Sequence, residues 1–365
     1  MNILLASTGN NIGGEETFTR NLALSLLSRG HRVWVAVGGK VPGEDSIRRN
    51  IPIADMDIKG RGLISLLKGA REIRKFIREF NIDIVHCQAV GPAIMGGIIL
   101  KLRWNQGEKW FYHGHGINKY TYKWLPFILN IFDLSITVSD FELIKLKSNG
   151  VKDSKIVRVH NGIDPKIFGF EQKEKDINNS KIRTELGIDK NEYIVGYIGR
   201  LSPEKGCDLI IPAIKCVLEK KKLIRLVIVG DGVMKNIMKH EVEKSNIGKQ
   251  VIFTGFRSDI PKVLCCFDSL ILPSYMETFS LTTLQAMGVG IPVIASDTGG
   301  NPEQVVPNFN GVLFKVGDYI DLSDKIIDII DNENSIKLGN NGKELIKKYL
   351  NEDRMVDEIE FYYKR

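Results

Sequence analysis

The sequence has few cysteines, and their spacing forms no metal-binding pair. Its 365 residues include five cysteines, an odd number, and no two of them are separated by two residues. This excludes a disulfide scaffold and argues against a zinc site built from paired thiolates. We expect reduced thiols in a cytoplasmic protein. The cysteines are Cys87, Cys207, Cys216, Cys265 and Cys266.

Long apolar runs are absent as well. No uninterrupted stretch reaches the ~20 apolar residues that are needed to cross a bilayer. The apolar stretch after Met1 is too short for a signal peptide. We therefore expect no membrane-spanning helix, and any membrane contact should be peripheral.

Two nucleotide-binding fingerprints are missing from the first strand-to-helix turn. Residues 7–16 contain Gly9, Gly13 and Gly14, but no Gly-Lys-Ser/Thr closes the turn and the spacing is not Gly-x-Gly-x-x-Gly. The turn is therefore not a Walker A loop, and an NAD-dependent oxidoreductase is disfavoured. Its glycines still allow close backbone approach, and a helix N-terminus offers free N–H groups to an anion.

Negative charge is scarce in the first half of the chain. The whole sequence has 51 Lys and Arg against 44 Asp and Glu, a net charge of +7. Residues 1–164 hold 23 basic and 15 acidic side chains, a net of +8, whereas residues 165–365 hold 28 and 29, a net of −1. A basic surface attracts phosphates, nucleic acid or anionic lipid, although most such charges are simply solvated.

Short apolar runs alternate with helical patterns along both halves. This alternation predicts an α/β fold with two doubly wound, Rossmann-like domains facing across a cleft in which ligands bind. We place the domains at residues 1–165 and 166–350, with a polar linker at Glu171–Lys181 and a mostly helical tail from Ile320. The expected strands are Asn2–Ala6, Val33–Val37, Ile82–His86, Trp110–His113, Leu134–Val138, Ile156–Val159, Tyr193–Ile198, Leu226–Val229, Val251–Thr254, Ser269–Leu272 and Pro292–Ala295.

Polar residues in the first half fall at the ends of these strands. His113 and His115 end one strand and begin its loop, so we expect them at the carboxyl edge of the sheet. Structural histidines held by hydrogen bonds are the alternative for either one. Asp55 and Asp57 form an Asp-x-Asp pair, but no partner supports them and we expect no metal site.

The second half has a series of polar loops at strand ends. Arg200 and Lys205 lie five residues apart in a loop with Gly and Pro, and they can converge on one polyanion; exposed loop cations are the alternative. The amides of Phe279–Leu281 lie at the start of a helix, where a phosphate is favourable. Glu277 precedes this turn and can accept hydrogen bonds from hydroxyls, and Gln285 follows on the helix.

Taken in order, these loops resemble those of the retaining glycosyltransferases of the GT-B fold, in particular the large glycosyltransferase family 4 (group 1). Each motif is unspecific alone, but the ordered set covers nearly the whole chain. The matching elements are Gly13-Gly14-Glu15-Glu16, His115-Gly116, Val138-Ser139, Asn161-Gly162-Ile163-Asp164, Gly199-Arg200 with Glu204-Lys205-Gly206, Gly230-Asp231-Gly232, Gly255-Phe256 and Glu277-Thr278-Phe279-Ser280-Leu281.

The resemblance implies roles for individual residues. Arg200 and Lys205 would bind the donor diphosphate and stabilise the departing nucleotide, and Glu277 would contact the donor sugar. Either His115, which we favour, or His113 would lie at the transferred sugar. No metal or other cofactor is implied, and the final helix, about 351–365, would pack on the first domain. The implied donor-binding set is Gly13, Gly14, Arg200, Lys205, Gly230, Phe256, Arg257, Glu277, Thr278, Phe279, Ser280, Leu281 and Gln285.

Two positions depart from the family pattern. The family has Glu-x7-Glu, with its second Glu on the nucleotide ribose, and this chain has Gln285 there. An amide can still bind ribose hydroxyls, but losing a hydrogen bond to a charged group costs ~1.5–3 kcal/mol. We therefore expect a weaker or altered nucleotide preference. Ser280 stands where the family often has glycine, and it can keep the backbone contact.

The implied activity is metal-independent transfer of a sugar, with retention at the anomeric carbon. We expect a UDP-hexose or UDP-N-acetylhexosamine donor and a glycan or lipid-linked acceptor, in cell-envelope polysaccharide or glycolipid synthesis. The alternatives are a nucleotide-sugar epimerase of the same fold and a catalytically silent nucleotide-sugar-binding subunit. A nucleic-acid partner would explain the basic half but not the phosphate loops of the near-neutral half, so we expect none.

Two segments of the first half are candidates for binding the acceptor or an anionic membrane surface. One is a basic stripe along Leu63–Phe80, for which a solvated helix face is the alternative. The other mixes cations with aromatic residues just after His115. The residues are Lys68, Arg71, Lys75, Arg78, Lys119, Lys123 and Trp124.

Overall fold

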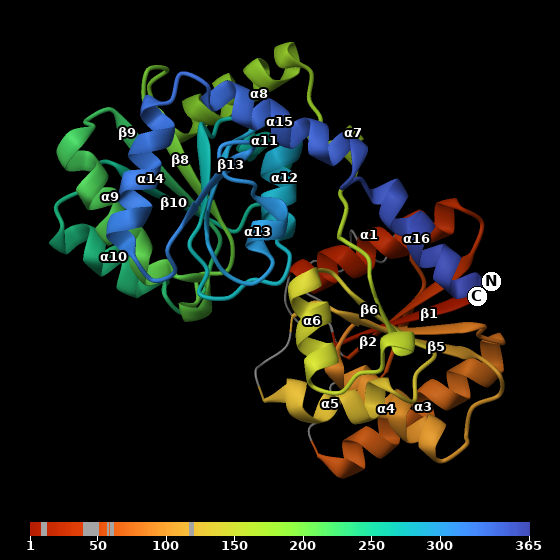
Figure 1. The fold of residues 1–365 in the computed structure, drawn as a ribbon. Coiled ribbons are helices and arrows are strands. Elements are labelled where there is room, and N and C mark those ends of the chain that lie inside the picture. The colour runs from red at the N-terminus through yellow and green to blue at the C-terminus, as the bar shows by residue number, and fades with distance from the viewer. Residues whose placement is uncertain (9–12, 39–50, 57, 59–61, 117–119) are drawn as a thin grey trace. The chain divides into compact units, whose positions relative to one another are not determined.

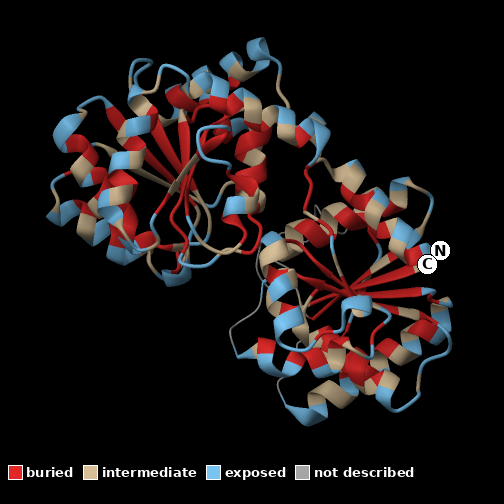
Figure 2. Cartoon of the chain, in the orientation of Figure 1, coloured by how far each residue is buried: buried red, intermediate tan, exposed pale blue. Residues whose placement is uncertain are grey.

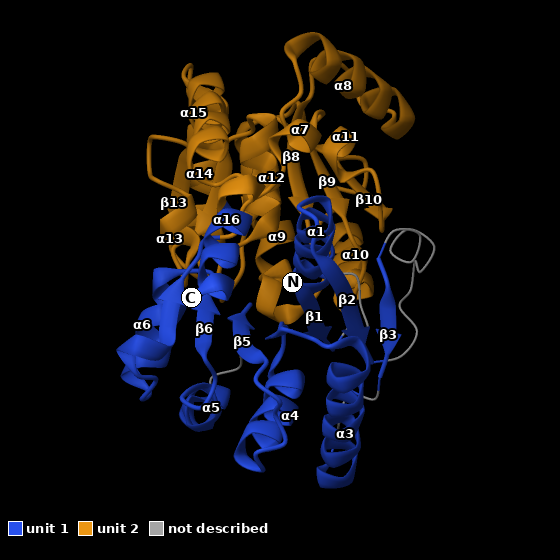
Figure 3. Ribbon diagram, turned by 90° about the vertical axis from the view of Figure 1, so that its right-hand side faces the viewer, with its two compact units in different colours: residues 1–160, 355–365 blue, residues 161–354 orange. Residues whose placement is uncertain are grey.

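The computed structural model describes the chain except for residues 9–12, 39–50, 57, 59–61 and 117–119. The chain forms two compact units, which Figure 3 shows in different colours. Unit 1 comprises Met1–His160 and Met355–Arg365, and unit 2 comprises Asn161–Arg354. The division that we placed between residues 165 and 166 lies close to the boundary between the units.

Unit 1 is built around a seven-stranded parallel sheet with the order β3-β2-β1-β4-β5-β6-β7 (Figure 1). The strands are β1 (Asn2–Ser7), β2 (Arg32–Val37), β3 (Ile53–Asp55), β4 (Ile84–Cys87), β5 (Lys109–Gly114), β6 (Leu134–Thr137) and β7 (Ile156–Arg158). The helices are α1 (Gly14–Ser28), α3 (Leu63–Phe80), α4 (Val90–Lys101), α5 (Thr121–Leu129), α6 (Asp140–Ser148) and the greater part of α16 (Glu352–Lys364).

The central strands β1, β4 and β5 of this sheet are buried along nearly their whole length, and buried strands are drawn as red arrows in Figure 2. In β1 every residue from Ile3 to Ser7 is buried, and β4 is buried throughout. Such continuous apolar runs are typical of parallel strands with helices on both faces. Helix α3 is one-sided by contrast, with Ile73 and Ile77 buried and Lys75 exposed.

Unit 2 contains a six-stranded parallel sheet with the order β10-β9-β8-β11-β12-β13. The strands are β8 (Tyr193–Ile198), β9 (Ile224–Val229), β10 (Val251–Gly255), β11 (Ser269–Leu272), β12 (Val293–Ser296) and β13 (Gly311–Phe314). The helices are α7 (Pro165–Phe168), α8 (Gln172–Leu186), α9 (Cys207–Lys220), α10 (Lys235–Lys244), α11 (Ile260–Leu264), α12 (Leu281–Val289), α13 (Asn301–Gln304), α14 (Tyr319–Asp331) and α15 (Ser335–Lys348).

Each sheet has a point at which the strand order reverses. In unit 1, β1 pairs with β2 on one side and β4 on the other; in unit 2, β8 pairs with β9 and β11. Doubly wound sheets bind ligands beyond the carboxyl ends of the strands at such a point. The segments that follow β1, β4, β8 and β11 begin at Thr8, Gln88, Gly199 and Pro273, respectively.

The prediction of two doubly wound α/β parts is confirmed, as is the helical tail, but the expected linker is wrong. Most of Glu171–Lys181 lies in helix α8. The segment has almost no apolar side chains to bury, and α8 is held instead by polar contacts of one arginine. Arg183 of α8 is 8% exposed. Its Nη1 donates to the carbonyl oxygens of Asp189 and Glu192 at 2.9 and 2.8 Å, and its Nη2 lies 3.1 Å from Asp268 Oδ2. Strands β3 and β13 were not predicted.

Helix α16 begins in unit 2 and ends in unit 1, because the boundary between the units falls at Met355. In unit 1, Arg29 at the end of α1 forms ion pairs with Asp357 and with Glu360, the latter at 3.1 Å between Nη1 and Oε2. The buried residues of the helix are Met355, Val356, Ile359 and Tyr363.

Candidate active site

Lys205 and Glu277, which we predicted as donor-binding residues, form an ion pair in unit 2. Lys205 Nζ donates to Glu277 Oε2 at 2.7 Å, and Ser274 Oγ donates to the same oxygen at 3.2 Å. The side chains of the pair are 27% and 13% exposed. They lie in the segments that follow β8 and β11, at the point where the strand order reverses. The fold thus brings together two predicted residues that are 72 positions apart.

Two glycines allow the backbone to pack closely beside this pair. Gly206 has a φ of +64°, and a Cβ there would lie 1.9 Å from the carbonyl oxygen of Pro273. Gly299 has a φ of +56°, and a Cβ there would lie 1.8 Å from the carbonyl oxygen of Glu277. Neither position has room for a side chain, so the segments that carry Lys205 and Glu277 depend on glycine for their close approach.

Arg200 is exposed and is paired with Glu204. Arg200 Nη2 donates to Glu204 Oε1 at 2.9 Å, and Ser202 Oγ donates to the same oxygen at 2.6 Å. Partial burial opposes ionisation of Glu204, but the hydrogen bond from Ser202 and the charge of Arg200 outweigh it and hold the pKa of Glu204 below its ordinary value. A diphosphate would therefore have to take the Arg200 guanidinium from Glu204.

The start of helix α12 is only partly available to a phosphate. Ser280 caps the helix, and its Oγ accepts the N–H of Thr283 at 3.2 Å. The N–H of Ser280 donates to Gln304 Oε1 at 2.7 Å, and Gln304 Nε2 donates back to the Ser280 carbonyl at 2.9 Å. Because Gln304 is 1% exposed, this clamp is internal to unit 2. It argues against the phosphate contact that we predicted for the Ser280 amide; Thr278, Phe279 and Leu281 flank the same turn.

Gln285 lies in the second turn of α12 and is half-buried. The helix buries Leu284 and Met287 in unit 2. Within the described part of the chain, the side-chain amide of Gln285 makes no hydrogen bond. Its side chain is therefore available to a ligand, as the prediction of a ribose contact requires.

Three other predicted donor residues lie at strand ends of unit 2. Gly230 follows β9, and its N–H donates to the last carbonyl of β10 at 2.9 Å. Phe256 follows β10 and is 58% exposed. The guanidinium of Arg257 binds Asp259, with Nη2 and Oδ2 at 2.7 Å, and Glu185 of α8; these two carboxylates raise its pKa. Arg257 is thus engaged inside unit 2, which argues against a donor contact.

In unit 1, the predicted glycine turn leads into helix α1. Gly13 caps the helix and Gly14 begins it. A Cβ on Gly14 would meet no described atom within 4 Å, so the described fold does not itself require glycine there. A ligand that lies close to the backbone would require glycine at this position. Glu15 accepts a hydrogen bond from Ser7 Oγ at 2.8 Å, and burial raises its pKa to about 7.

His113 and His115 stack on each other at the end of β5. Their rings lie 4.7 Å apart and are parallel within 3°. His86 of β4 stacks on His113 at 5.2 Å and 23°. Phe18 of α1 contacts both His113 and His115 edge-on at 4.6 Å. We call His86, His113 and His115 the imidazole column.

Burial keeps the imidazole column neutral. It lowers the pKa of His86 and His115 to about 3, and it lowers the pKa of His113 well below the ordinary value; neighbouring rings add to the effect on His86 and His113. The half-buried His115 has its Nε2 3.0 Å from Gln88 Oε1. Because an amide oxygen only accepts, Nε2 carries the proton and Nδ1 is left as an acceptor.

A buried carboxyl lies behind the loop that carries His115. Glu142 of α6 is fully buried, and its oxygens lie 2.7 Å from where a Cβ on Gly114 would be. Burial raises the pKa of Glu142 to about 7, and the backbone groups of Gly116 and Val138 act in the opposite direction. The carboxyl therefore takes up its proton as the pH falls through about 7.

The predicted acceptor surface of unit 1 is exposed, and it is more apolar than we expected. Leu63 is 70% exposed, and its neighbour Ile64 is 86% exposed. On α5, Phe127 is 77% exposed. No helix in the described residues has the length and apolar content to cross a membrane. Of the predicted cations and Trp124, Lys119 lies outside the described residues, and the exposed ones are Lys68, Arg71, Lys75, Arg78, Lys123 and Trp124.

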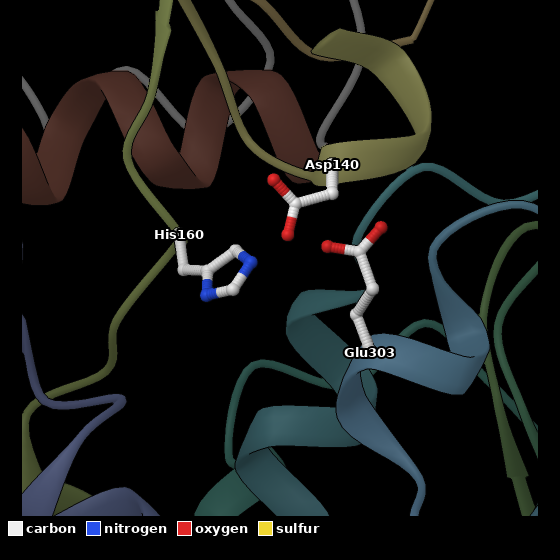
Figure 4. A group of neighbouring side chains, drawn as sticks. All are labelled: Asp140, His160 and Glu303. Carbon is white, nitrogen blue, oxygen red and sulfur yellow. The ribbon is translucent and has the colours of Figure 1, made fainter. Parts of the chain in front are cut away.

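Figure 4 shows Asp140, His160 and Glu303, whose side chains are of metal-ligating types. Asp140 and His160 belong to unit 1 and Glu303 to unit 2, so the three are not one site of either unit. Within unit 1, Arg158 Nε lies 2.9 Å from Asp140 Oδ1, and its Nη1 lies 2.9 Å from His160 Nδ1. The Arg158 guanidinium therefore already contacts both of these residues within unit 1. Asp55 ends β3 and is exposed, and Asp57 lies outside the described residues.

Sequence reasoning missed several polar residues that shape these sites. Glu142 and Gln304 are buried and belong to no catalytic motif. His86 lies inside an apolar strand, and Tyr363 lies near the end of the chain. Gln88 offered the one usable signal, because it lies two residues after the predicted strand Ile82–His86 and directly after β4 of the structure.

Both halves of the chain match models of glycosyltransferase families. Residues 12–167 match the model described as Glycosyltransferase Family 4, and residues 178–345 match the model described as Glycosyl transferases group 1. These two matches cover the unit 1 and unit 2 sites described above.

Among curated proteins, the chain is similar to enzymes that transfer sugars. It is 28% identical over 317 residues to the UDP-Gal:alpha-D-GlcNAc-diphosphoundecaprenol alpha-1,3-galactosyltransferase of Escherichia coli, covering 82% of this chain and 80% of that protein. It is 23% identical over 364 residues to the N-acetyl-alpha-D-glucosaminyl L-malate synthase of Bacillus anthracis, covering 96% and 94%.

Among solved structures, the chain is similar to Anabaena Alr3699/HepE in complex with UDP and glucose. The TM-score is 0.88 at 21% sequence identity, and the match covers 100% of this chain and 99% of that one. This likeness supports the two doubly wound domains of the GT-B fold. The chain belongs to the GT-B glycosyltransferases of group 1 and family 4, which transfer sugars from nucleotide sugars.

Proposed function

We propose that this protein is a retaining hexosyltransferase that uses a UDP-hexose or a UDP-N-acetylhexosamine. The acceptor is a hydroxyl of a glycan or of a lipid-linked glycan, in cell-envelope polysaccharide or glycolipid synthesis. The name of the E. coli relative contains UDP-Gal and a diphosphoundecaprenol-linked GlcNAc. The Anabaena structure holds UDP and glucose. These names support a UDP-sugar donor and a lipid-linked acceptor for this chain.

The ion pair of Lys205 and Glu277 carries the donor part of the proposal. It combines a cation for a diphosphate with a carboxylate that can accept hydrogen bonds from sugar hydroxyls. Both side chains lie where the strand order of the unit 2 sheet reverses, which is where such sheets bind nucleotides. On donor binding, Lys205 exchanges its ion pair with Glu277 for one with the diphosphate. Glu277 then accepts hydrogen bonds from hydroxyl groups of the sugar.

The transfer step needs stabilisation of separated charge. As the glycosidic bond to the diphosphate breaks, the sugar becomes positive and the diphosphate becomes more negative. Lys205 and Arg200, two cations positioned before the reaction, favour that separation. Arg200 exchanges Glu204 for phosphate oxygens, so that one charge-assisted contact replaces another. These two residues take the place that a divalent metal has in other transferases, and we propose that no metal is required.

His115 is the residue of unit 1 that we propose to contact the transferred sugar. Its Nδ1 is an acceptor for a sugar hydroxyl, because the N–H of Nε2 donates a hydrogen bond to Gln88 Oε1. The ring is neutral, and a neutral acceptor does not repel the positive charge that develops on the sugar. Gly14 leaves room for close approach of the donor to the start of α1.

The exposed side chains of α3 and α5 form the proposed contact with a lipid-linked acceptor or with the cytoplasmic membrane surface. Leu63, Ile64 and Phe127 offer apolar area, and the neighbouring cations attract anionic headgroups. Binding to vesicles that contain anionic lipid should weaken as the salt concentration rises. Failure to bind such vesicles at low salt would contradict the membrane contact.

A panel of nucleotide sugars tests the whole proposal. We expect one or more UDP-sugars to raise the melting temperature, and transfer to a lipid-linked glycan to follow when both substrates are present. The anomeric proton coupling of the product should match that of the donor, which establishes retention. Conversion of the sugar without any acceptor would indicate an epimerase instead. Binding without turnover would indicate a silent subunit, an outcome to which the Gln285 departure points.

A further inference from the structure

Helix α16 places a tyrosine hydroxyl against the imidazole column. Tyr363 is 1% exposed, and its hydroxyl lies 2.5 Å from His86 Nδ1. Its ring packs edge-on against Phe111 of β5 at 5.0 Å. Its backbone carbonyl accepts a hydrogen bond from Lys109 Nζ at 3.2 Å. The end of α16 is therefore fixed to the sheet of unit 1 by both the side chain and the backbone of Tyr363.

Counting of polar groups gives the direction of this hydrogen bond. Within the described residues, His86 Nε2 is buried and has no partner. If Tyr363 donates to Nδ1, the Nε2–H of His86 is the one group left unpaired. If Nδ1–H donated to Tyr363, the lone pair on Nε2 and the tyrosine O–H would both be unpaired. Since buried polar groups are expensive to leave unpaired, Tyr363 donates and the proton of His86 lies on Nε2.

Direct ring contacts connect His86 to His115 through His113. His86 stacks on His113, and His113 stacks on His115. Neither ring nitrogen of His113 has a hydrogen-bond partner among the described residues, so only packing fixes that ring. The column therefore has a hydrogen bond at each end, from Tyr363 at one end and to Gln88 at the other, and its middle member depends on both.

We propose that Tyr363 is a positioning residue for His115, acting through His86 and His113. The proposal rests on the role of His115 at the transferred sugar. Tyr363 fixes the tautomer and the ring plane of His86. His86 limits where the unpaired His113 ring can lie, and His113 supports the face of His115. Without the hydroxyl, the His86 ring can turn over, and the acceptor Nδ1 of His115 loses its defined position.

The test removes the hydroxyl and keeps the ring. Tyr363→Phe retains the packing against Phe111, and Tyr362→Phe is the matched control, because it makes the same change at the next residue of α16. Loss of one hydrogen bond that positions a group should lower kcat about three- to tenfold with little change in the donor KM. The rate is measured as UDP release with whichever sugar nucleotide of the panel turns over. Tyr362→Phe should leave kcat unchanged.

Ring-nitrogen NMR of protein labelled at histidine gives a readout that does not depend on turnover. The chain has six histidines, so the spectrum is simple. Tyr363→Phe should shift the nitrogen signals of His86 and also those of His115, while Tyr362→Phe shifts neither. Signals of His115 that stay unchanged in Tyr363→Phe would overturn the proposal, whatever the rate. Shifted signals in a protein that transfers no sugar would uphold the positioning of His115 and refute the proposed function instead.

A double-mutant cycle separates action through His86 from a general loss of structure. If Tyr363 acts through His86, adding Tyr363→Phe to a His86→Gln protein should change kcat by less than twofold. Effects that multiply in the double variant would contradict the proposal. Urea denaturation of each variant checks that unit 1 remains folded. Tyr363→Phe should unfold at a lower urea concentration than Tyr362→Phe, because it leaves the buried His86 Nδ1 without a partner, but it should still unfold in one cooperative transition.

Discussion

The imidazole column should make unit 1 lose stability in mild acid. The ordinary pKa of each ring is 6.5, and burial lowers it in the folded unit to about 3 for His86 and His115 and well below 6.5 for His113. Below pH 6.5 the unfolded chain therefore binds protons that the folded unit does not. The stability from these rings is fully present above pH 6.5 and is lost as the pH falls.

Two carboxyls, of the half-buried Glu15 and the buried Glu142, act in the opposite direction. Burial raises the pKa of Glu15 and Glu142 from 4.5 to about 7, so the folded unit holds their protons between these values and gains stability as the pH falls to 4.5. Each proton changes the free energy of unfolding by ~1.4 kcal/mol per pH unit. Between pH 6.5 and 4.5 the unfolded chain binds three imidazole protons that the folded unit lacks, and the folded unit holds two carboxyl protons that the unfolded chain lacks. The unfolded chain therefore binds about one proton more than the folded unit. The free energy of unfolding of unit 1 should therefore fall by ~3 kcal/mol between pH 6.5 and 4.5, and more steeply below.

Tryptophan fluorescence reports on unit 1 alone, because Trp34, Trp104, Trp110 and Trp124 all lie in it. Urea denaturation at several pH values gives the free energy of unfolding for the wild type and for His113→Phe. The phenyl ring removes a titrating group, and it breaks no hydrogen bond to a described residue, because both nitrogens of His113 are unpaired there. The variant should therefore have nearly constant stability between pH 6.5 and 4.5. The exposed His240 supplies the control, His240→Phe, which should keep the wild-type slope.

Equal slopes for the wild type and His113→Phe would refute the account of a buried, neutral His113. A wild-type stability that rises as the pH falls from 6.5 to 4.5 would show that the carboxyls outweigh the imidazoles, and it would contradict the low pKa values of the column.

Three further predictions concern unit 2. Arg200→Ala should lower kcat at saturating donor by tenfold or more, through loss of a charge-assisted contact of ~1.5–3 kcal/mol, and unchanged turnover would remove Arg200 from the transfer step. Gly206→Ala should cost more stability in urea titrations than the control Gly187→Ala. The two residues have similar φ values, +64° and +65°, but only a Cβ at Gly206 would clash, at 1.9 Å from the Pro273 carbonyl oxygen. The control should lose only ~1–2 kcal/mol, and equal losses would contradict the close packing. Gln285→Glu should tighten nucleotide binding about tenfold or more in calorimetry and Gln285→Ala should weaken it, whereas no effect from alanine would place Gln285 outside the site.

The fold was predictable because parallel strands leave a strong local signal. Runs such as Leu226–Val229 are apolar throughout and end in glycine-containing turns, and the structure has strands there. Strand β3 has only three residues, and α8 is polar over most of its surface, so neither shows such a pattern. Arg183 holds α8 through partners that are distant in the sequence, which local composition cannot reveal.

The candidate site was predictable where position along the chain determined it. Lys205, Glu277 and His115 all follow predicted strands, and parallel strands bring their carboxyl ends to one edge. What could not be predicted was the pairing of side chains. Arg257 follows a strand equally well, yet it is engaged by structural carboxylates. The clamp of Ser280 by Gln304 and the contact of Tyr363 with His86 join residues far apart in sequence and lacking any motif.

Calorimetric titration of UDP into the wild type and into Lys205→Met tests the central claim most directly. The claim is that the pair of Lys205 and Glu277 in unit 2 marks the diphosphate position of the donor. Lys221→Met is the matched control, since Lys221 is a partly buried lysine that is paired with Asp331. We predict that the wild type and the control bind UDP equally and that Lys205→Met binds it at least tenfold more weakly. Equal binding by all three proteins would contradict the account.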